Sequence, residues 1–171
     1  MNKLSAYIRD IPDFPKPGIV FKDITPLLSD EEGLAHCLHN LMALVGAKRI
    51  DKVVGIESRG FIFGPMLAKE LDAGFVPVRK PGKLPSKTVS ESYALEYGED
   101  TLEMHADAIQ PGERVLIHDD VLATGGTAEA VCKLVTQLGG TIVQCNFIIE
   151  LEFLKGRELI ANYDVQAAIT Y

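Results

Sequence analysis

The chain of 171 residues is long enough for one domain with a hydrophobic core, and its 47% hydrophobic and 24% charged residues are ordinary for a globular protein. Seventeen basic and 24 acidic residues give a formal net charge of -7, which argues against broad electrostatic binding of nucleic acid or of a membrane surface. We therefore expect one domain over residues 1–171 and a small-molecule partner.

The N-terminal part of the chain precedes the first clear helical pattern. It contains a loop rich in proline, glycine and lysine at Pro12–Gly18. A helix is then predicted from about Asp30 to Val45, because leucines recur at helical spacing and Gly46 supplies a stop. Ser29 and Glu32 are expected to form a capping box at its start.

Short apolar runs then alternate with helical patterns, as in consecutive βαβ units. The segments are Val53–Ile56, Phe61–Leu71, Phe75–Val78, Val115–His118, Thr127–Leu138 and Ile142–Leu151. The strand runs do not alternate polar with apolar residues, which is expected of parallel strands covered by helices on both faces. We predict an α/β fold with a mainly parallel twisted sheet flanked by helices, and ligands beyond the carboxyl ends of the strands.

One segment breaks the βαβ alternation. Thr88–Tyr97 and Thr101–His105 are two extended stretches joined by a turn at Gly98–Asp100, which predicts a hairpin. Its polar content and the basic approach at Arg79–Lys87 indicate a mobile flap, about residues 79–107, rather than a pair of core strands. The alternative for the basic approach is a solvated flexible segment without a ligand.

The segment Val115–Thr127 joins a buried strand, an acidic pair, a loop of small residues and a helix start. The loop residues are Ala123, Thr124, Gly125, Gly126 and Thr127. The glycines permit a backbone path that brings N–H groups close to an anion, and the threonines add hydroxyl donors. Because a helix N-terminus follows, the loop predicts a site for one monophosphate.

Asp119 and Asp120 precede this loop, where a vicinal diol would lie if the phosphate belonged to C5 of a ribose. A carboxylate accepts hydrogen bonds from both hydroxyls, so a ribose 5-phosphate unit is the predicted ligand. The loop has neither the G-x-x-x-x-G-K-[ST] nor the G-x-G-x-x-G pattern, which argues against a nucleoside triphosphatase and a dinucleotide fold. Alternatively, the aspartates cap a turn that the glycines permit.

These thirteen residues resemble the phosphoribosyltransferase motif and depart from it at His118, where the family usually has an apolar residue and where the side chain should point away from the ligand. Similarity to the adenine phosphoribosyltransferases extends over nearly the whole chain. The matching segments are Phe14–Ile24, Glu57–Phe61, Arg79–Pro85 and Tyr93–Gly98. The resemblance implies a type I phosphoribosyltransferase fold, with a small N-terminal hood at about residues 1–30 and the flexible hairpin flap.

The resemblance also implies the reaction. It implies transfer of the 5-phosphoribosyl group from 5-phosphoribosyl-1-pyrophosphate to N9 of adenine, giving AMP and pyrophosphate in purine salvage, with Mg2+ as cofactor. A chain of net charge -7 needs local cations to bind pyrophosphate. The candidates are Arg59, Arg79, Lys80 and Lys83, of which Arg59 and Lys83 would stabilise the departing pyrophosphate. Mg2+ would be held mainly through the substrate, and Glu57–Ser58 would be joined by a cis peptide bond that directs backbone N–H groups toward the pyrophosphate.

For adenine, the resemblance implies backbone contacts from Val20 and Lys22 and stacking of Phe21 on the purine. Read without the family, Val20 and Phe21 are core residues. Glu96 would act as the general base that holds and then accepts the N7 proton, so that N9 attacks the anomeric carbon; its alternative is an exposed strand carboxylate. Tyr97 is a further candidate for substrate binding and, with the following glycine, for the flap hinge.

The three cysteines, Cys37, Cys132 and Cys145, form no C-x-x-C pair and are predicted to be buried thiols. Residues 1–10 lack the pattern of a secretory leader, and no apolar run reaches the roughly 18 residues that span a bilayer. We expect a cytoplasmic protein, and the resemblance suggests a homodimer with the flap near the partner's site. Two alternatives stay open: a phosphoribosyltransferase for 6-oxopurines, and a non-catalytic sensor of the same ribose ligand.

Overall fold

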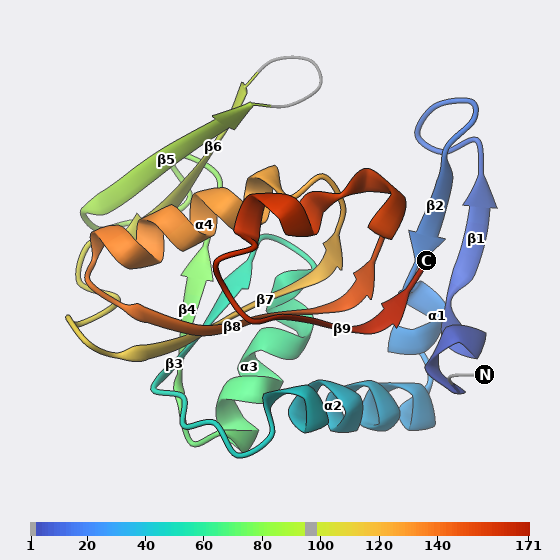
Figure 1. Ribbon diagram of the computed structural model, residues 1–171, viewed down its shortest axis with the longest axis horizontal. Coiled ribbons are helices and arrows are strands. Elements are labelled where there is room, and N and C mark those ends of the chain that lie inside the picture. Colours follow the sequence, from blue (N-terminus) through green and yellow to red (C-terminus); the bar gives the residue numbers. More distant parts are fainter. Residues whose placement is uncertain (1–2, 95–98) are drawn as a thin grey trace.

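The computed structural model describes residues 3–94 and 99–171. Its centre is a five-stranded sheet in the order β4-β3-β7-β8-β9 (Figure 1). The strands are β3 Lys52–Ile56, β4 Gly74–Val78, β7 Arg114–Leu122, β8 Thr141–Glu150 and β9 Val165–Thr170. All neighbouring pairs are parallel, so the predicted parallel sheet is confirmed.

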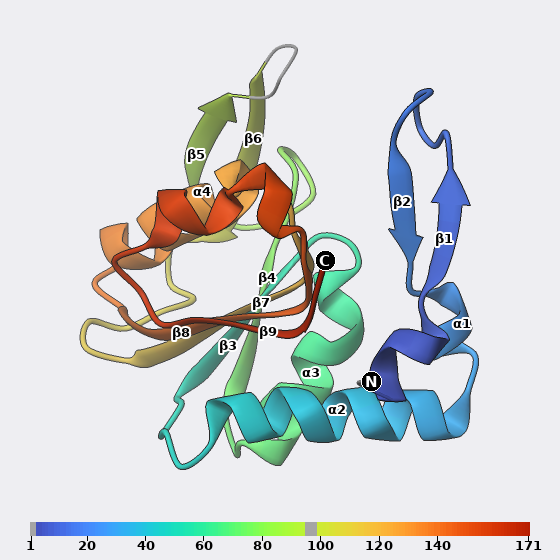
Figure 2. The same cartoon turned by 45° about the vertical axis from the view of Figure 1, so that its right-hand side comes forward.

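Two antiparallel hairpins, each separate from the central sheet, point in the same direction (Figure 2). The first pairs β1 Arg9–Pro12 with β2 Val20–Asp23, and the second pairs β5 Thr88–Ala94 with β6 Glu99–His105. The second hairpin is confirmed, but two of the three predicted turn residues are strand residues. Glu99 and Asp100 belong to β6 and pair with β5, while Gly98 lies outside the described residues.

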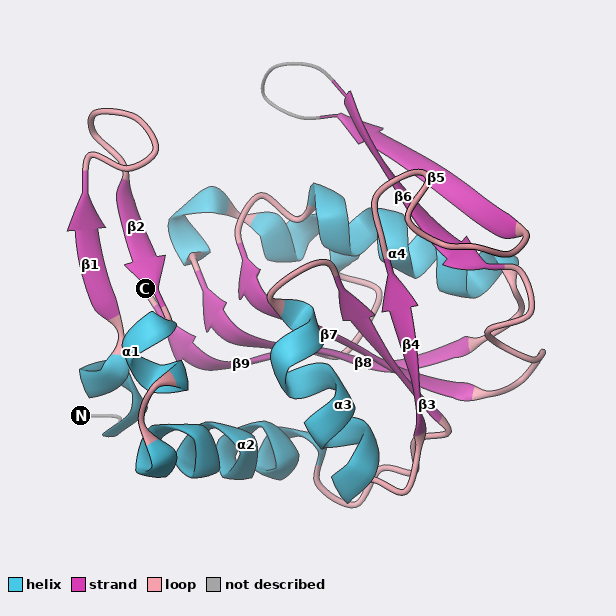
Figure 3. Ribbon diagram, turned by 180° about the vertical axis from the view of Figure 1, so that it is seen from behind, coloured by secondary structure: helices cyan, strands magenta, loops and turns pink. Residues whose placement is uncertain are grey.

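Helices cover both faces of the sheet. Helices α2 Glu31–Val45 and α3 Gly60–Glu70 lie on one side and α4 Gly126–Gln137 on the other (Figures 1 and 3). Short helical segments complete the fold: η1 Lys3–Tyr7, α1 Thr25–Leu28, η2 Glu152–Leu154 and η3 Gly156–Ile160. None of the helices in the described part of the chain is long and apolar enough to cross a bilayer.

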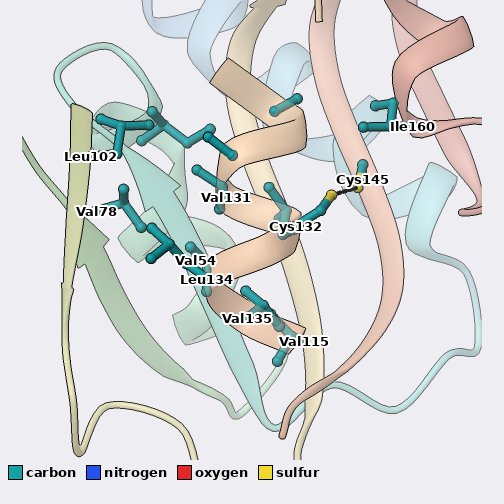
Figure 4. Packing of buried hydrophobic residues seen from close by; sticks show 14 of the residues in the cluster. Val54, Val78, Leu102, Val115, Val131, Cys132, Leu134, Val135, Cys145 and Ile160 are labelled. Carbon is teal, nitrogen blue, oxygen red and sulfur yellow. Dashed lines mark hydrogen bonds between the residues drawn. The ribbon is translucent and has the colours of Figure 1, made fainter. Parts of the chain in front are cut away.

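Successive residues of the central strands enter different cores. Val53 packs in the cluster of α2 and α3, whereas Val54 packs in the cluster of α4 beside Leu134 (Figure 4). Leu116 and Ile117 of β7 divide in the same way. Because side chains alternate across a strand, a sheet buried on both faces needs the unbroken apolar runs seen in the sequence.

The three cysteines are buried and free, as predicted. Figure 4 shows Cys132 of α4 facing Cys145 of β8, and the two Sγ atoms are 3.8 Å apart. This separation is well above the length of about 2.05 Å of a disulfide bond. The two thiols fill space between helix and sheet.

The second hairpin is more deeply packed than predicted. Leu102 and Met104 of β6 are fully buried and belong to the α4 cluster. Because alternate residues of a strand point to one side, these two reach the core while their neighbours remain partly exposed. The interpretation as a flap without core strands is therefore wrong for this part of β6.

The start of α2 also differs from the prediction, because Asp30 rather than Ser29 is the N-cap. The Asp30 side chain accepts a hydrogen bond from the Gly33 amide at 2.7 Å. Ser29 is the C-cap of α1, and its hydroxyl donates to Pro26 at 3.0 Å. One helix ends where the next begins, so Ser29 serves the first and leaves the cap of α2 to its neighbour.

Candidate active site

The carboxyl ends of β3 and β7 bring the two central motifs together. The strands pair in parallel up to Gly55 and His118, so residues after β3 lie beside the acidic pair. Strand β7 runs to Leu122, four residues beyond its predicted end at His118, because it stays paired with the long strand β8. Asp119 and Asp120 therefore stand within the strand rather than after it.

Three adjoining cavities surround this point, and Asp119 and Thr127 line all of them. The polar cavity, about 250 Å³, is lined also by Glu57, Ser58, Arg59, Lys80, Tyr93 and Asp100. The loop cavity, about 70 Å³, is lined also by Ala123, Thr124 and Gly125. The hairpin cavity, about 290 Å³, is lined also by Val20, Phe21, Lys22 and Leu151.

Asp119 lines all three cavities and Asp120 lines the polar and hairpin cavities, and together they form an acidic wall. Asp120 is 4% exposed, and its carboxylate accepts a hydrogen bond from Nε of Arg59, whose side chain is half exposed. The Asp119 carboxylate accepts from the Asp120 amide at 2.9 Å. Burial, followed by the neighbouring charge of Asp120, raises the pKa of Asp119 well above its usual range. The pair thus offers several acceptor oxygens to a hydroxyl-bearing ligand or to a cation.

Gly60 at the start of α3 explains how the helix reaches this wall. A Cβ atom there would lie 2.9 Å from both Oδ1 of Asp119 and the carbonyl oxygen of His118. Only glycine lets the helix begin so close to the acidic pair. The preceding peptide bond between Glu57 and Ser58 is cis, as the family resemblance implied.

The polar cavity contains a network of ion pairs. The Lys80 amide donates to Oε2 of Glu57 at 2.9 Å, and Arg79 binds both oxygens of the same carboxylate at 3.2 and 3.3 Å. These contacts, the Lys80 amide first, lower the pKa of Glu57. The Lys80 ammonium lies 2.8 Å from the Asp100 carboxylate, and this contact raises the pKa of Lys80. The cavity therefore holds a cation, Lys80, whose ammonium is paired with Asp100 of β6 and whose backbone amide is held by Glu57 just after β3.

The loop cavity lies at the N-terminus of α4. Gly125 is the N-cap with φ of +88°, a conformation that favours glycine. The first N–H groups of a helix have no acceptor within the helix, and the macrodipole adds partial positive charge there. The Thr127 hydroxyl donates to the Tyr93 hydroxyl at 3.2 Å, which ties the loop to the second hairpin. An anion of phosphate size fits this environment.

The hairpin cavity is the most apolar of the three. Val20 is 47% exposed and Phe21 is partly exposed, so the alternative that both are core residues is wrong. The Phe21 ring packs edge-on against Phe14, with centroids 5.3 Å apart, and the Arg59 guanidinium lies 5.4 Å from its centroid. A flat aromatic ligand next to the acidic pair would meet the Phe21 ring.

Most of the predicted residues line these cavities. Arg79 and Lys83 do not: Arg79 holds Glu57, and its Nη1 donates to the Lys83 carbonyl at 3.5 Å. Gly126 begins α4 behind the loop. Glu96 and Tyr97 lie outside the described residues.

The sequence interpretation missed Tyr93, Asp100 and Glu57 as cavity residues. Tyr93 and Asp100 are cross-strand partners in the second hairpin, so both face the cavity only in the observed register. Glu57 lies in one of the matching segments, but its partner Lys80 is 23 residues away in the sequence, just after β4. The sequence alone predicts neither the strand register nor this long-range contact.

His118 points away from the cavities, as expected. Its side chain is fully buried, its Nδ1 lies 2.8 Å from Oδ1 of Asn146, and its ring packs edge-on against Phe63 of α3. Burial lowers its pKa to about 4. The ring is therefore neutral at physiological pH and serves the core behind Asp119.

Comparisons with known proteins agree with this geometry. Residues 25–166 match the family model of the phosphoribosyl transferase domain. The adenine phosphoribosyltransferase of Flavobacterium johnsoniae is 64% identical over 169 residues, which cover 99% of each chain. The solved structure of the Rhodothermus marinus adenine phosphoribosyltransferase has 59% identity and a TM-score of 0.93, covering 98% of this chain and 96% of that one.

A third relative was solved with ligands. The adenine phosphoribosyltransferase of Saccharomyces cerevisiae, complexed with D-2,5-dideoxy-2,5-imino-altritol 1,6-bisphosphate and adenine, is 41% identical with a TM-score of 0.92. The match covers 97% of this chain and 96% of that one.

Proposed function

The chain belongs to the phosphoribosyltransferase family, among its adenine phosphoribosyltransferases, and we propose that it transfers the 5-phosphoribosyl group of 5-phosphoribosyl-1-pyrophosphate to N9 of adenine. The products are AMP and pyrophosphate. One observation carries the proposal: three adjoining cavities share Asp119 and Thr127. A ribose bound at these two residues needs separate sites for its 5-phosphate, for the leaving group on C1 and for the base. The loop cavity suits an anion, the polar cavity contains cations, and the hairpin cavity is the most apolar.

The loop cavity takes the 5-phosphate, because its helix N-terminus and glycine-rich backbone suit an anion. Asp119 and Asp120 take the ribose hydroxyls, which carboxylates accept. The hairpin cavity takes adenine, with Phe21 on the purine face and backbone groups of Val20 and Lys22 at its edge. In this arrangement residues 1–30 form a hood over the base.

The polar cavity takes pyrophosphate. Lys80 lines it, and Arg59 stands between it and the hairpin cavity. Arg59 and Lys83 stabilise the negative charge that develops on the leaving pyrophosphate. Lys83 lies outside the cavity in this structure, with its carbonyl bound by Arg79, so it acts only after a movement of the segment 79–87.

The acidic wall fits the proposed Mg2+. This ion prefers oxygen ligands and commonly combines one or two carboxylates with substrate phosphates and water. Glu57, Asp119 and Asp120 place carboxylates around the polar cavity. Held mainly through the substrate, the ion would neutralise charge on the leaving group.

The protein's own residues move the proton. Glu96 holds the N7 proton of adenine and accepts it as N9 bonds to C1 of the ribose and the bond from C1 to pyrophosphate breaks. The segment 79–87 and the part of the second hairpin outside the core, with Tyr97 near the proposed hinge, exclude water from the reactive ribosyl centre. We further propose a cytoplasmic homodimer, which is supported by the family resemblance alone.

A steady-state assay tests the proposed reaction. Purified chain with labelled 5-phosphoribosyl-1-pyrophosphate and Mg2+ should form labelled AMP from adenine and release one pyrophosphate per AMP. Hypoxanthine, guanine and xanthine are the matched controls. Preference for any of these 6-oxopurines would contradict the adenine assignment, and tight donor binding without turnover of any base would favour the sensor.

A further inference from the structure

The segment between β8 and β9 lies against the phosphate loop, although it follows the loop by about thirty residues. A Cβ atom built on Gly125 would lie 2.3 Å from the carbonyl oxygen of Gly156. A Cβ atom built on Gly156 would lie 2.1 Å from the carbonyl oxygen of Ala123 and 2.8 Å from the amide of Gly125. The two backbones are in direct contact, with no room for a side chain between them.

The two glycines are needed for different reasons. Gly125 has φ of +88°, so its own conformation favours glycine. Gly156 is not among the positive-φ glycines, so alanine there is conformationally permitted. The three atoms nearest to a Cβ at Gly156 all belong to the backbone of the phosphate loop.

The residues that follow Gly156 anchor the segment. Arg157 donates from Nε to Oε1 of Glu150 at 2.8 Å and from Nη2 to the other carboxylate oxygen, and its Nη1 donates to the Val165 carbonyl at 2.6 Å. Glu150 ends β8, Val165 begins β9, and the Glu150 side chain is only 4% exposed. Ile160 is buried in the α4 cluster. Gly156 is thereby held against the loop by the sheet and by α4.

We propose that Gly156 and Arg157 are positioning residues for the 5-phosphate subsite. A loop with two consecutive glycines has more backbone freedom than other loops, and its N–H groups bind phosphate well only when they converge. The segment at Gly156 restricts that freedom from behind, and Arg157 fixes the segment. This inference rests on the proposed function, in which residues 123–127 hold the phosphate.

Gly156→Ala gives the main test. The variant should raise KM for 5-phosphoribosyl-1-pyrophosphate and Kd for AMP by about tenfold or more. The reason is that a displacement of a positioned group by about 1 Å can reduce its effect up to about 100-fold. KM for adenine, measured at saturating donor, should stay within about twofold. Gly33→Ala in α2 is the matched control, since its Cβ would also lie close to a carbonyl, 2.9 Å from that of Leu27, at a glycine without positive φ. The control should lose stability and leave all three constants unchanged.

Arg157 provides a second test that does not depend on the folding of the glycine variant. Arg157→Met should weaken AMP binding without changing KM for adenine, and Arg157→Lys should restore part of the affinity because it keeps the charge beside Glu150. A merely structural role would lower the melting temperature of Arg157→Met and leave the ratio of the donor and adenine constants unchanged. That result, or wild-type AMP affinity in folded Gly156→Ala, would overturn the inference.

Thr124→Val separates this inference from the proposed function. If the loop holds the phosphate, Thr124→Val weakens AMP binding through loss of a hydroxyl donor. Unchanged affinity in Thr124→Val would contradict the proposed phosphate site itself. Weakened binding in Thr124→Val together with unchanged binding in both Gly156→Ala and Arg157→Met would overturn only the positioning role.

Discussion

Replacement of His118 by glutamine should remove much of the acid sensitivity of this fold. His118 is fully buried behind the acidic wall, and burial lowers its pKa from 6.5 to about 4. Between these two pH values the unfolded chain binds a proton at this position and the folded chain does not. The unfolding free energy therefore has its full value, as far as His118 is concerned, above pH 6.5 and falls as the pH decreases from 6.5 to about 4. Below about pH 4 the protonation of His118 no longer changes it.

The magnitude follows from the width of this interval. One pH unit corresponds to about 1.4 kcal/mol, so His118 should cost about 3 kcal/mol of unfolding free energy between pH 6.5 and 4. Glutamine cannot take up the proton, yet its amide can donate to Oδ1 of Asn146, the present partner of the ring. The variant should therefore lose a constant amount of stability and show a shallower dependence on pH.

Urea denaturation at several pH values between 7.5 and 4 measures this slope. As the pH falls, the unfolding free energy of wild type should decrease by about 3 kcal/mol more than that of His118→Gln. His39→Gln, on the exposed side of α2, is the control and should keep the wild-type slope. Parallel curves for wild type and His118→Gln would refute the reasoning.

Three further variants test the site. Asp120→Asn should weaken AMP binding by about 10- to 100-fold in calorimetry, because a hydrogen bond to a charged group contributes about 1.5 to 3 kcal/mol; wild-type affinity would exclude Asp120 from the ribose site. Lys80→Met should raise KM for the pyrophosphate donor about tenfold and spare KM for adenine, whereas equal changes in both would place Lys80 outside the pyrophosphate site. Glu96→Gln should lower kcat about 100-fold or more without changing AMP affinity; unchanged turnover would rule out its role as the base.

Much of the fold was predictable from local pattern. The uninterrupted apolar run at Val53–Ile56 indicates a strand buried on both faces, and the structure places its successive residues in two cores. Gly46 ends α2 with φ of +62°, as its position after the leucine pattern predicted. The Asp119–Asp120 pair and the loop after it are adjacent in the sequence, so the sequence alone was enough to predict a ribose 5-phosphate ligand.

The remaining features depend on contacts between distant segments. Tyr93 and Asp100 enter the polar cavity because of the register of one hairpin, which a shift by one residue would reverse. Leu102 is apolar within a polar stretch, and only the packing of β6 on α4 shows that it is buried. Gly156 carries no local motif, since its requirement for glycine comes from the loop at Ala123.

A crystal structure of the AMP complex tests the central claim most directly. The phosphate should lie within hydrogen-bonding distance of backbone N–H groups of residues 123–127, with the ribose hydroxyls on Asp119 and Asp120 and the purine against Phe21. A phosphate bound instead at Lys80 in the polar cavity, with the loop empty, would contradict the assignment of all three cavities.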